Sequence, residues 1–272
     1  MNGDESIVCG DRLEVRALGG VPVVGAGADL GGVVLEALAR SAITLESGDV
    51  VVLASKIVSR AEGRQVDLGT VEASEEAHAI ARELGKDPRF VELVLRETAE
   101  VSRRSPSAFV VKNRLGVVCA NAGIDGTNAR PLEAPPGSGP WALLLPEDPD
   151  RSAEIVRNRL ESETGAAIGV VITDSVGRPF RFGTVGIAVG VAGLPPLWDQ
   201  RGRVDLFGTR LEQTITALAD QIAAAADLVA GQAAEGRAVV HVRGIRFTPG
   251  RHSARELVRP SDQDLYVRKA PS

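Results

Sequence analysis

The chain has 272 residues, and its 44% of hydrophobic side chains can bury a core, which excludes a disordered protein. With 31 Lys and Arg against 36 Asp and Glu, the net charge of −5 argues against a protein that coats nucleic-acid phosphates. Apolar runs such as 50–54 and 141–145 are far shorter than the ~20 residues that span a bilayer, and the N-terminus lacks a signal-peptide pattern. We expect a soluble, cytoplasmic protein that binds neither nucleic acid nor membrane.

The few cysteines and histidines limit the metal chemistry of the chain. Two cysteines and three histidines lie too far apart in the sequence for a disulfide framework or a zinc cluster. Any metal ion must therefore be held by oxygen atoms. Only four of the 31 basic residues are lysines, so 27 are arginines, the side chain that binds phosphate and carboxylate through two parallel hydrogen bonds. GC-rich codon usage is the alternative explanation of this excess.

The first half of the chain alternates between strand and helix patterns. In chain order we predict a strand over 12–24, a helix from 29 to about 40, a strand over 49–55, helices over 74–84 and 87–98, and a hairpin of 107–111 with 115–120. Asp29 and the pair Asp87 and Pro88 are typical helix starts. The β-branched run 49–55 is typical of a strand buried on both faces.

The second half follows a Pro- and Gly-rich stretch, 131–140, which is the best candidate linker. Behind it we predict strands over 141–145, 168–173, 185–191 and 238–242, and helices over 150–163 and 210–230. The last helix has the clearest apolar stripe, with Thr209 and Glu212 as a capping box and Gly231 as its C-cap. Hairpins without a regular βαβ rhythm predict an α+β fold in which mixed and antiparallel sheets pack against helices.

The same patterns suggest domain boundaries. We expect a ragged N-terminus over 1–12 and a main domain over 13–244, with 131–140 as the candidate division between two subdomains. A basic, polar tail over 245–272 follows, and its last dozen residues are expected to fray.

Standard nucleotide-binding motifs are absent from the sequence. There is no G-x-x-x-x-G-K-[ST], and the Gly-x-Gly at 25–27 is followed by a glycine one residue too late for G-x-G-x-x-G. The loop 123–128 instead places Asp125, Thr127 and Asn128 close together after a strand pattern. Such oxygen ligands suit Mg²⁺ or Mn²⁺ and the phosphates that accompany them. An Asx-type turn, in which these side chains bond their own backbone, is the alternative.

A second polar group follows the apolar strand pattern 168–172. Asp174 and Ser175 place a carboxylate beside a hydroxyl at a strand end, where many enzymes hold a metal ion. Arg178 and Arg181, three residues apart, could clamp an anionic substrate or a phosphate. A helix-capping Asp with two solvated arginines is the alternative, and the coincidence of both features at one strand end favours a functional site.

Cationic residues beside other predicted elements are further candidates. Arg201 and Arg203 precede the predicted long helix, and Lys56 follows the strand 49–55 with Arg60 about one turn later. These side chains could meet phosphates, although a solvated lysine is commoner. Cys119 lies inside a strand pattern without a nearby histidine, which favours a core residue over a nucleophile.

Four segments taken together carry a resemblance to a known family: 49–63 (DVVVLASKIVSRAEG), 121–128 (NAGIDGTN), 172–181 (ITDSVGRPFR) and 219–229 (ADQIAAAADLV). They resemble the coenzyme F(420)-0:L-glutamate ligase family, in the same order, and the similarity extends over about 13–244. The resemblance implies an enzyme that joins L-glutamate to the terminal carboxylate of the deazaflavin precursor F(420)-0 and then adds further glutamates by γ-linkages.

The resemblance also implies cofactors and assembly. GTP is the co-substrate, and two sites for Mg²⁺ or Mn²⁺ are expected, with K⁺ as a further candidate cation. The fold is expected to be an unusual α+β one that forms an intertwined homodimer.

Carried over residue by residue, the resemblance assigns metal ligands and nucleotide contacts. The implied metal ligands are Asp125, Asp174, Ser175 and Gln232, of which the two aspartates act in catalysis through the metal. The implied GTP contacts are Gly20, Val21, Pro22, Val23, Ser55, Lys56, Arg60, Asn128, Ala230, Gly231, Gln232, Ala233, Ala234, Glu235, Gly236 and Arg237. Three positions depart from the family pattern: Arg60 replaces Lys, Ser175 replaces Thr, and Thr209 stands where Arg is frequent, which removes an anion contact.

The implied chemistry begins with phosphorylation by GTP, because a carboxylate does not react with an amine at neutral pH. Glutamate then attacks the acyl phosphate, and phosphate leaves. Two other functions remain open at this point. One is a nucleotide-dependent ligase that acts on another acid, and the other is a non-catalytic protein that binds a deazaflavin or a nucleotide and whose acidic loops hold a structural ion.

Overall fold

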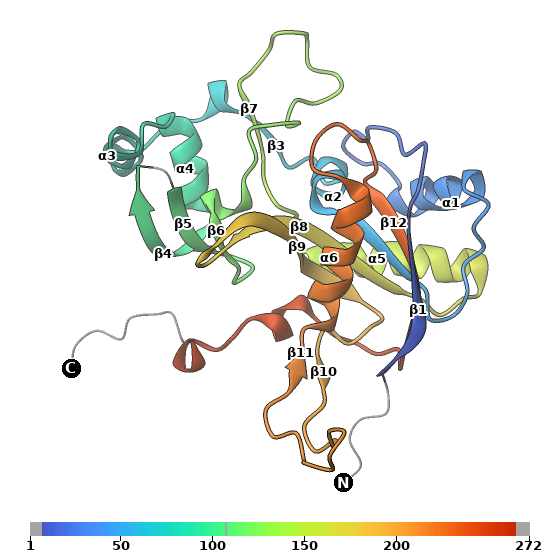
Figure 1. Ribbon diagram of the computed structural model, residues 1–272. Helices are drawn as coiled ribbons and strands as arrows, with labels where there is room; N and C mark the ends of the chain where they lie inside the picture. The colour runs from blue at the N-terminus through green and yellow to red at the C-terminus, as the bar shows by residue number, and fades with distance from the viewer. Residues whose placement is uncertain (1–6, 107, 265–272) are drawn as a thin grey trace.

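A five-stranded sheet forms the centre of the computed structural model, which describes residues 7–106 and 108–264 (Figure 1). The strands lie in the order β1-β12-β2-β8-β9, with the bounds β1 Ile7–Ala17, β12 Val239–Phe247, β2 Val50–Ala54, β8 Gly169–Arg178 and β9 Arg181–Ala192. β2 and β8 run parallel, and the other neighbouring strands of this sheet run antiparallel. The predicted α+β fold with mixed and antiparallel sheets is confirmed.

Helices cover both faces of this sheet because its central strands are apolar on both faces. Val51 and Leu53 of β2 belong to the core shared with α1 (Leu30–Arg40) and α5 (Pro149–Thr164). Val50 and Val52 belong to the core shared with α6 (Leu218–Ala230). This two-sided burial explains why the run 49–55 lacks a polar alternation.

A smaller lobe lies beside the sheet and has a core of its own (Figure 1). It contains α3 (Glu75–Leu84), α4 (Pro88–Arg96) and the antiparallel sheet of β4 (Thr98–Ser105), β5 (Ala108–Asn113) and β6 (Val118–Ala120). The short strands β3 (Gln65–Asp67) and β7 (Trp141–Leu143) pair at its border. The irregular stretch 131–140 precedes β7 within this lobe's segment of the chain.

Polar side chains and glycines cap several helix ends, including the two starts predicted at Asp29 and Asp87. The side chains of Asp29, Ser74 and Asp87 accept backbone hydrogen bonds at the starts of α1, α3 and α4. Gly85 and Gly165 adopt left-handed conformations, with φ of 64° and 70°, where α3 and α5 end. One further helix, α2 (Ser55–Ala61), follows β2 directly, and the 3₁₀ turns are η1 (Leu68–Thr70), η2 (Asn121–Gly123), η3 (Ala254–Leu257) and η4 (Ser261–Gln263).

The predicted helix over 210–230 is wrong in its first eight residues. α6 begins at Leu218, without a side-chain cap. The preceding chain forms a hairpin arm, here defined as 198–216, whose ends pair as β10 (Trp198–Asp199) and β11 (Ile215–Thr216). The backbone N–H of Thr209 donates to Asp205 in a turn of this arm, so Thr209 and Glu212 do not form the expected capping box.

Other strand boundaries also differ from the expected ones. The first strand covers Ile7–Ala17 instead of 12–24, because its pairing with β12 ends at Ala17 and Gly20, with φ of 72°, turns the chain. β4 was not expected, since its polar residues are mostly exposed and show no alternation. Ser107 and the residues 265–272 of the tail lie outside the described residues. In the described part of the chain, no helix combines the length and the apolar character needed to cross a bilayer.

Candidate active site

Segments far apart in the sequence meet at one edge of the central sheet. β1 and β2 end at this edge and β12 begins there, since the N–H of Leu18 donates to the carbonyl of Val239 and the N–H of Ala54 to that of Ala238. β8 reaches the same edge, because Ala54 pairs with Thr173. In α/β sheets, ligands bind outside the carboxyl ends of the strands. The candidate segments beside these strand ends are 20–23, 55–60, 174–175 and 230–237.

Asp174 is the first residue of β8 beyond its pairing with β2, and it is buried beside the start of α2. The hydroxyl of Ser55 donates a hydrogen bond to Asp174 Oδ1 at 2.8 Å. Burial raises the pKa of Asp174, as does the negative charge of Asp125, against the lowering effects of Ser55 and Lys56. A nearby cation therefore stabilises the charged form of this carboxyl group.

Lys56 supplies such a cation. Its Nζ lies 2.5 Å from Asp125 Oδ2. The backbone of Asp125 exchanges two hydrogen bonds with Leu143 of β7, which fixes the acidic loop. Burial acts to lower the pKa of Lys56, but the attraction of Asp125, Asp174 and Asp227 outweighs burial and raises this pKa. The ammonium group is therefore charged at neutral pH.

Arg60 joins two of the candidate loops. It is buried, and its Nε donates to the carbonyl of Val24 at 3.1 Å while its Nη1 donates to the carbonyl of Asn128 at 2.9 Å. The first loop follows β1, and the second carries Asp125. The guanidinium group that the resemblance assigns to GTP thus also fixes the positions of these two loops.

A further acidic residue lies at this edge, Asp227 of α6, which the sequence patterns did not single out. Its Oδ1 accepts hydrogen bonds from the Ser175 hydroxyl at 3.3 Å and from the Gln232 side-chain amide at 2.5 Å. Successive residues of a strand point to opposite faces, so Ser175 faces α6 while Asp174 faces α2. Asp227 and Asp220 are the charged residues of an otherwise mostly apolar helix. A charged residue on an apolar helix was the signal that the sequence offered for Asp227. Helical periodicity alone does not distinguish a functional aspartate from a solvated one.

The two remaining segments that were expected to contact the nucleotide, 20–23 and 230–237, are mostly exposed loops with hydrogen bonds of their own. In the first, the carbonyl of Gly20 accepts a hydrogen bond from Arg40 Nη1 at 2.6 Å. In the second, the chain turns at Gly231, with φ of 80°, and the Glu235 carboxylate accepts the N–H of Ala233 at 2.8 Å. Both loops lie at the sheet edge that carries Lys56, because 20–23 follows the end of β1 and 230–237 precedes the start of β12.

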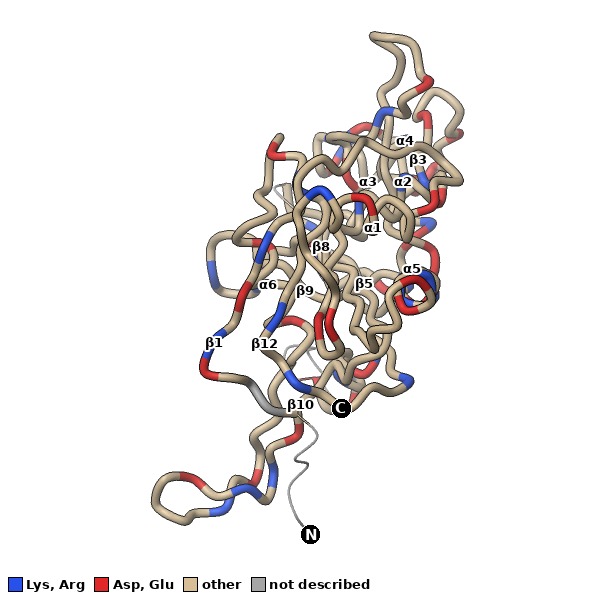
Figure 2. Tube along the Cα trace, turned by 90° about the vertical axis from the view of Figure 1, so that its right-hand side faces the viewer, with Lys and Arg blue, Asp and Glu red and all other residues tan. Residues whose placement is uncertain are grey.

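The four arginines expected to clamp an anion lie in two other places. Arg178 and Arg181 stand at the tip of the β8–β9 hairpin, where Arg178 donates to the carbonyl of Phe182 at 3.0 Å. Arg201 and Arg203 lie in the hairpin arm, which projects away from α2 (Figures 1 and 2).

Within the arm, both arginines contact neighbouring side chains. Arg201 forms an ion pair with Asp199 at 2.5 Å, and the Arg203 guanidinium lies 5.5 Å from the centre of the Trp198 ring. Within one chain, the structure does not bring Arg201 and Arg203 to Asp174. Their role as an anion clamp stays a prediction.

Cys119 is buried near this site but is not poised as a nucleophile. Burial raises the pKa of its thiol to about 12, and the negative charge of Asp174 adds to the shift. The thiol is therefore protonated at neutral pH. The prediction that Cys119 is a core residue is confirmed.

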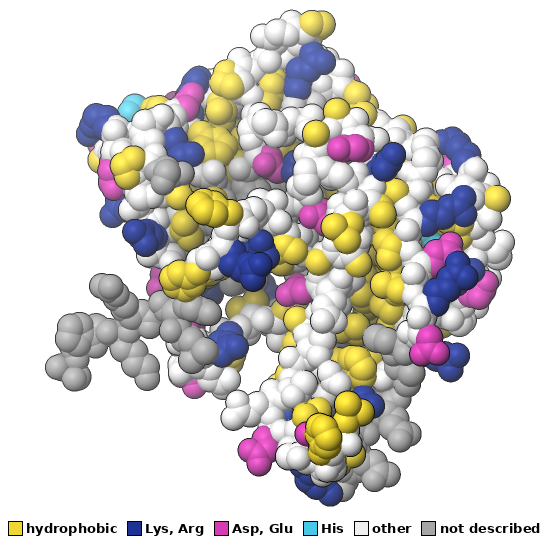
Figure 3. Space-filling view, viewed as in Figure 1, with side chains coloured by type: hydrophobic (Ala, Val, Ile, Leu, Met, Phe, Trp, Pro, Cys, Tyr) yellow, Lys and Arg dark blue, Asp and Glu magenta, His cyan; other side chains and the backbone are white. Residues whose placement is uncertain are grey.

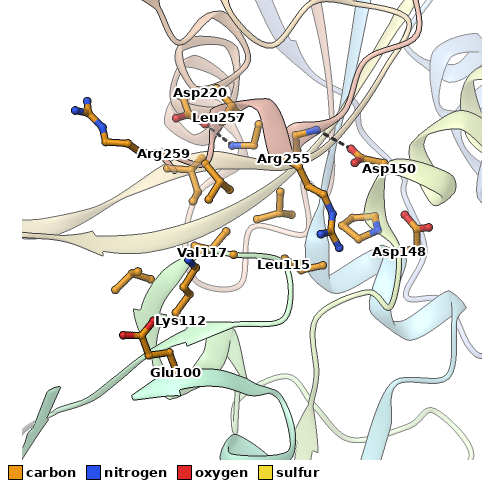
Figure 4. Close-up of a pocket in the computed structure, with 18 of the residues that line it drawn as sticks. Glu100, Lys112, Leu115, Val117, Asp148, Asp150, Asp220, Arg255, Leu257 and Arg259 are labelled. Atoms are coloured by element: carbon orange, nitrogen blue, oxygen red, sulfur yellow. Dashed lines mark hydrogen bonds between the residues drawn. The ribbon is translucent and has the colours of Figure 1, made fainter. Parts of the chain in front are cut away.

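A separate cleft of about 630 Å³ lies between β9, the β5–β6 hairpin and the segment around η3 (Figure 4). Two of its carboxylates hold groups of the same chain: Asp150 accepts hydrogen bonds from the Ser253 hydroxyl at 2.6 Å and the Ala254 N–H at 3.0 Å, and Asp220 accepts one from the Ala188 N–H at 2.9 Å. Among the described residues, none of the expected metal or nucleotide contacts lines this cleft.

The donor atoms at the sheet edge fit a hard cation. Asp125, Asp174, Ser175 and Gln232 offer carboxylate, hydroxyl and amide oxygens. Among residues 7–106 and 108–264, no three Asp, Glu, His or Cys side chains form a group that could hold a metal ion. Mg²⁺ typically uses one or two carboxylates together with substrate phosphates and waters. This donor set therefore suits an ion that binds together with a nucleotide rather than a metal held by protein alone.

Comparison with known proteins identifies the family. Residues 20–244 match the model of a family described as F420-0:Gamma-glutamyl ligase. The chain belongs to the F420-0:gamma-glutamyl ligase family. The resemblance carried by the four segments is thereby confirmed, and the matched range contains all of the implied metal and GTP residues.

Relatives named coenzyme F420:L-glutamate ligase are similar over most of their length. The chain is 46% identical to that of Methanopyrus kandleri over 236 residues, which cover 85% of this chain and 90% of the relative. It is 45% identical to that of Methanothermobacter thermautotrophicus over 249 residues, 91% and 96% of the two chains. For the protein of Archaeoglobus fulgidus the identity is 41% over 257 residues, 94% and 97% of the two chains.

Proposed function

We propose that this family member is a coenzyme F420-0:L-glutamate ligase that uses GTP to join L-glutamate to the terminal carboxylate of F420-0 and then adds further γ-linked glutamates. The family match and the similarity to ligases of that name support the reaction. The observation that carries the proposal is the meeting of Lys56 with Asp125 and Asp174 at the sheet edge.

Amide formation from a carboxylate requires activation, because oxide is not a leaving group. A carboxylate oxygen of F420-0 attacks the γ-phosphorus of GTP, and the bond to GDP breaks. The α-amine of glutamate then attacks the acyl carbon, loses a proton, and phosphate leaves with the oxygen. Such phosphoryl transfer depends mainly on positioning and on charge stabilisation, so no protein nucleophile is needed.

Each residue of the edge has a part in this reaction. Lys56 neutralises charge on the terminal phosphates, and Asp125 and Asp174 hold Mg²⁺ or Mn²⁺. When bound, the metal ion stabilises negative charge on the transferring phosphoryl group. Ser55 keeps the Asp174 carboxylate oriented through its hydrogen bond. The segments 20–23 and 230–237 contact the nucleotide.

Replacing either aspartate tests the proposal. Asp125→Ala and Asp174→Ala should each reduce glutamate addition at least ~10³-fold, because each removes a metal-binding carboxylate. The deazaflavin product is measured by mass spectrometry, and circular dichroism checks the fold. Glu83→Ala, an exposed acidic residue of α3, is the matched control and should keep wild-type turnover. Wild-type turnover in either aspartate variant would refute the assignment.

The same assay separates the other functions that the sequence leaves open. Release of GDP and phosphate that requires both glutamate and F420-0 supports the proposed ligase. Release that depends on another acid would indicate a different carboxylate–amine ligase, and nucleotide binding without turnover would indicate a binding protein.

The proposed enzyme acts as a homodimer, as the resemblance implies. The arm presents Val204, Leu206 and Phe207 to solvent, and Figure 3 shows hydrophobic side chains gathered at its end. An apolar tip on a projecting hairpin favours contact with a second copy of the chain.

A further inference from the structure

Asp227 occupies its position because α6 packs closely over the β8–β9 ribbon. Ser175 of β8 pairs with Gly186 of β9. A Cβ atom on Gly186 would lie 2.8 Å from the carbonyl oxygen of Ala223 and 3.0 Å from Cβ of Asp227. The missing side chain at Gly186 therefore lets α6 approach until the Asp227 carboxylate reaches Ser175.

The chemistry of a carboxylate then fixes the orientation of two neighbours. Ionised Asp227 is an acceptor only, so Ser175 must direct its proton and Gln232 its amide NH₂ group toward Oδ1. The hydroxyl lone pairs of Ser175 and the amide oxygen of Gln232 are left for another partner. These are the two oxygen donors that accompany Asp125 and Asp174 in the expected metal set.

The charge of Asp227 acts on the same edge. Its attraction for the ammonium group of Lys56 contributes, with Asp125 and Asp174, to the raised pKa of Lys56 in spite of burial. Carboxylates from a loop, a strand and a helix thus attract one lysine, although only Asp125 and Asp174 were expected from the sequence.

We propose that Asp227 is a positioning residue of the metal and nucleotide site, which orients the Ser175 hydroxyl and the Gln232 amide so that their oxygens face one of the two expected cations. The proposal rests on the proposed function. Partners that orient metal ligands are usually worth about 10–100-fold in metal affinity.

The test measures Mn²⁺ binding to the full chain by electron paramagnetic resonance of free Mn²⁺, in the presence of GDP and without turnover. Asp227→Asn should weaken binding about 10–100-fold, because an amide can present its NH₂ group in place of its oxygen, so it no longer obliges the Gln232 amide to donate and allows that amide to turn. Asp220→Asn makes the same change on the same helix, keeps an acceptor for the Ala188 N–H, and should bind Mn²⁺ like the wild type. The melting temperatures of the two variants show whether a loss of binding reflects a loss of fold.

A double variant that exchanges the carboxylate and the amide tests whether Mn²⁺ binding can be restored. In the double variant Asp227→Asn with Gln232→Glu, the amide donates and the carboxylate accepts, so an oxygen again faces the site and most of the Mn²⁺ affinity should return. Wild-type affinity in Asp227→Asn, or a double variant no better than Asp227→Asn, would overturn the positioning role. A wild-type chain that binds no Mn²⁺ with GDP would instead contradict the metal site of the proposed function.

Discussion

Two buried carboxylates of the central sheet have opposite environments. Asp49, just before β2, accepts hydrogen bonds from Arg243 Nε at 2.8 Å, from His241 at 2.9 Å and from the Glu46 N–H at 2.9 Å. Burial acts to raise the pKa of Asp49, but Arg243, His241 and the Glu46 N–H outweigh it and lower this pKa well below its usual range. Asp174 has no such set of donors, and its raised pKa makes it the carboxylate suited to binding a cation.

The lowered pKa of Asp49 predicts an acid-dependent stability. Its contribution is complete above the unfolded-state pKa of about 4 and is lost as the pH falls toward the folded-state pKa, because the unfolded chain takes up the proton first. Asp49→Asn should lower the free energy of unfolding by about 2–3 kcal/mol at pH 7. The difference from wild type should shrink at pH 3.

Urea unfolding at pH 7, 5 and 3 and constant ionic strength measures this difference. Asp199→Asn, which alters an exposed ion pair of the arm, is the control and should have no measurable effect. An equal difference between wild type and Asp49→Asn at pH 7 and pH 3 would contradict the prediction.

Lys56 pairs with Asp125, so it would compete with the proposed metal ion for this carboxylate, and this gives a second prediction. Lys56→Met should strengthen Mn²⁺ binding in the absence of nucleotide, because the ammonium that lies 2.5 Å from Asp125 is removed. The same variant should lower kcat/KM for GTP by about 10²–10³-fold, because a cation at the phosphates is lost. Calorimetric titration with Mn²⁺ and steady-state kinetics measure the two effects, and Lys56→Arg should retain part of the activity.

A loss of both Mn²⁺ binding and GTP turnover in Lys56→Met would instead mean that the lysine maintains the shape of the site.

At the scale of residues, the sequence predicted Lys56, Asp125 and Asp174 as site residues but not Asp227. Lys56, Asp125 and Asp174 lie in short sequence motifs beside predicted strands or loops. Asp227, in contrast, reaches Ser175 only because Gly186 lets α6 approach β8.

At the scale of elements, α6 shows which sequence signals suffice. Leu218, Ile222 and Ala226 are buried and fix the helix face, as the apolar stripe predicts. The stripe continued backward through Ile215 and Leu211, which lie in the hairpin arm. Periodicity could not reveal the boundary at Leu218, because the turn bonds to Asp205 and the β10–β11 pairing depend on residues outside the helical pattern.

Close packing of α6 on the β8–β9 ribbon predicts a sensitive glycine. Gly186→Ala should lower stability by about 1–3 kcal/mol, because its Cβ would lie 2.8 Å from a backbone carbonyl oxygen of α6 that has little room to move. Gly177→Ala, on the same ribbon with no atom within 4 Å of its Cβ, should be nearly neutral. Thermal unfolding compares the two variants, and equal melting temperatures would show that α6 can shift at no cost.

At the scale of the whole molecule, ion pairs within the chain are an explanation of the arginine excess besides codon bias. Several arginines, among them Arg64, Arg157 and Arg243, form ion pairs with carboxylates of the same chain. Basic and acidic residues are interspersed along the chain in Figure 2. Cations are therefore placed locally, which agrees with anionic small-molecule substrates and not with a basic surface for nucleic acid.

The arm predicts the assembly state. Leu206 and Phe207 expose 98% and 92% of their surfaces, and they lie on a hairpin that projects from the rest of the chain (Figure 1). Burying such side chains against a second copy removes apolar surface from water. Wild-type protein should therefore sediment as a dimer, and the double variant Leu206→Ser with Phe207→Ser should shift toward monomer at the same concentration.

Sedimentation velocity over a range of protein concentrations measures this shift. Ile155→Ser, which changes an exposed apolar residue of α5, is the matched control and should keep the wild-type sedimentation coefficient. A dimer that survives in the double variant would place the interface elsewhere than on the arm. Because Arg201 and Arg203 lie on this arm, loss of the dimer with unchanged glutamate addition would also show that they do not act on a partner's site.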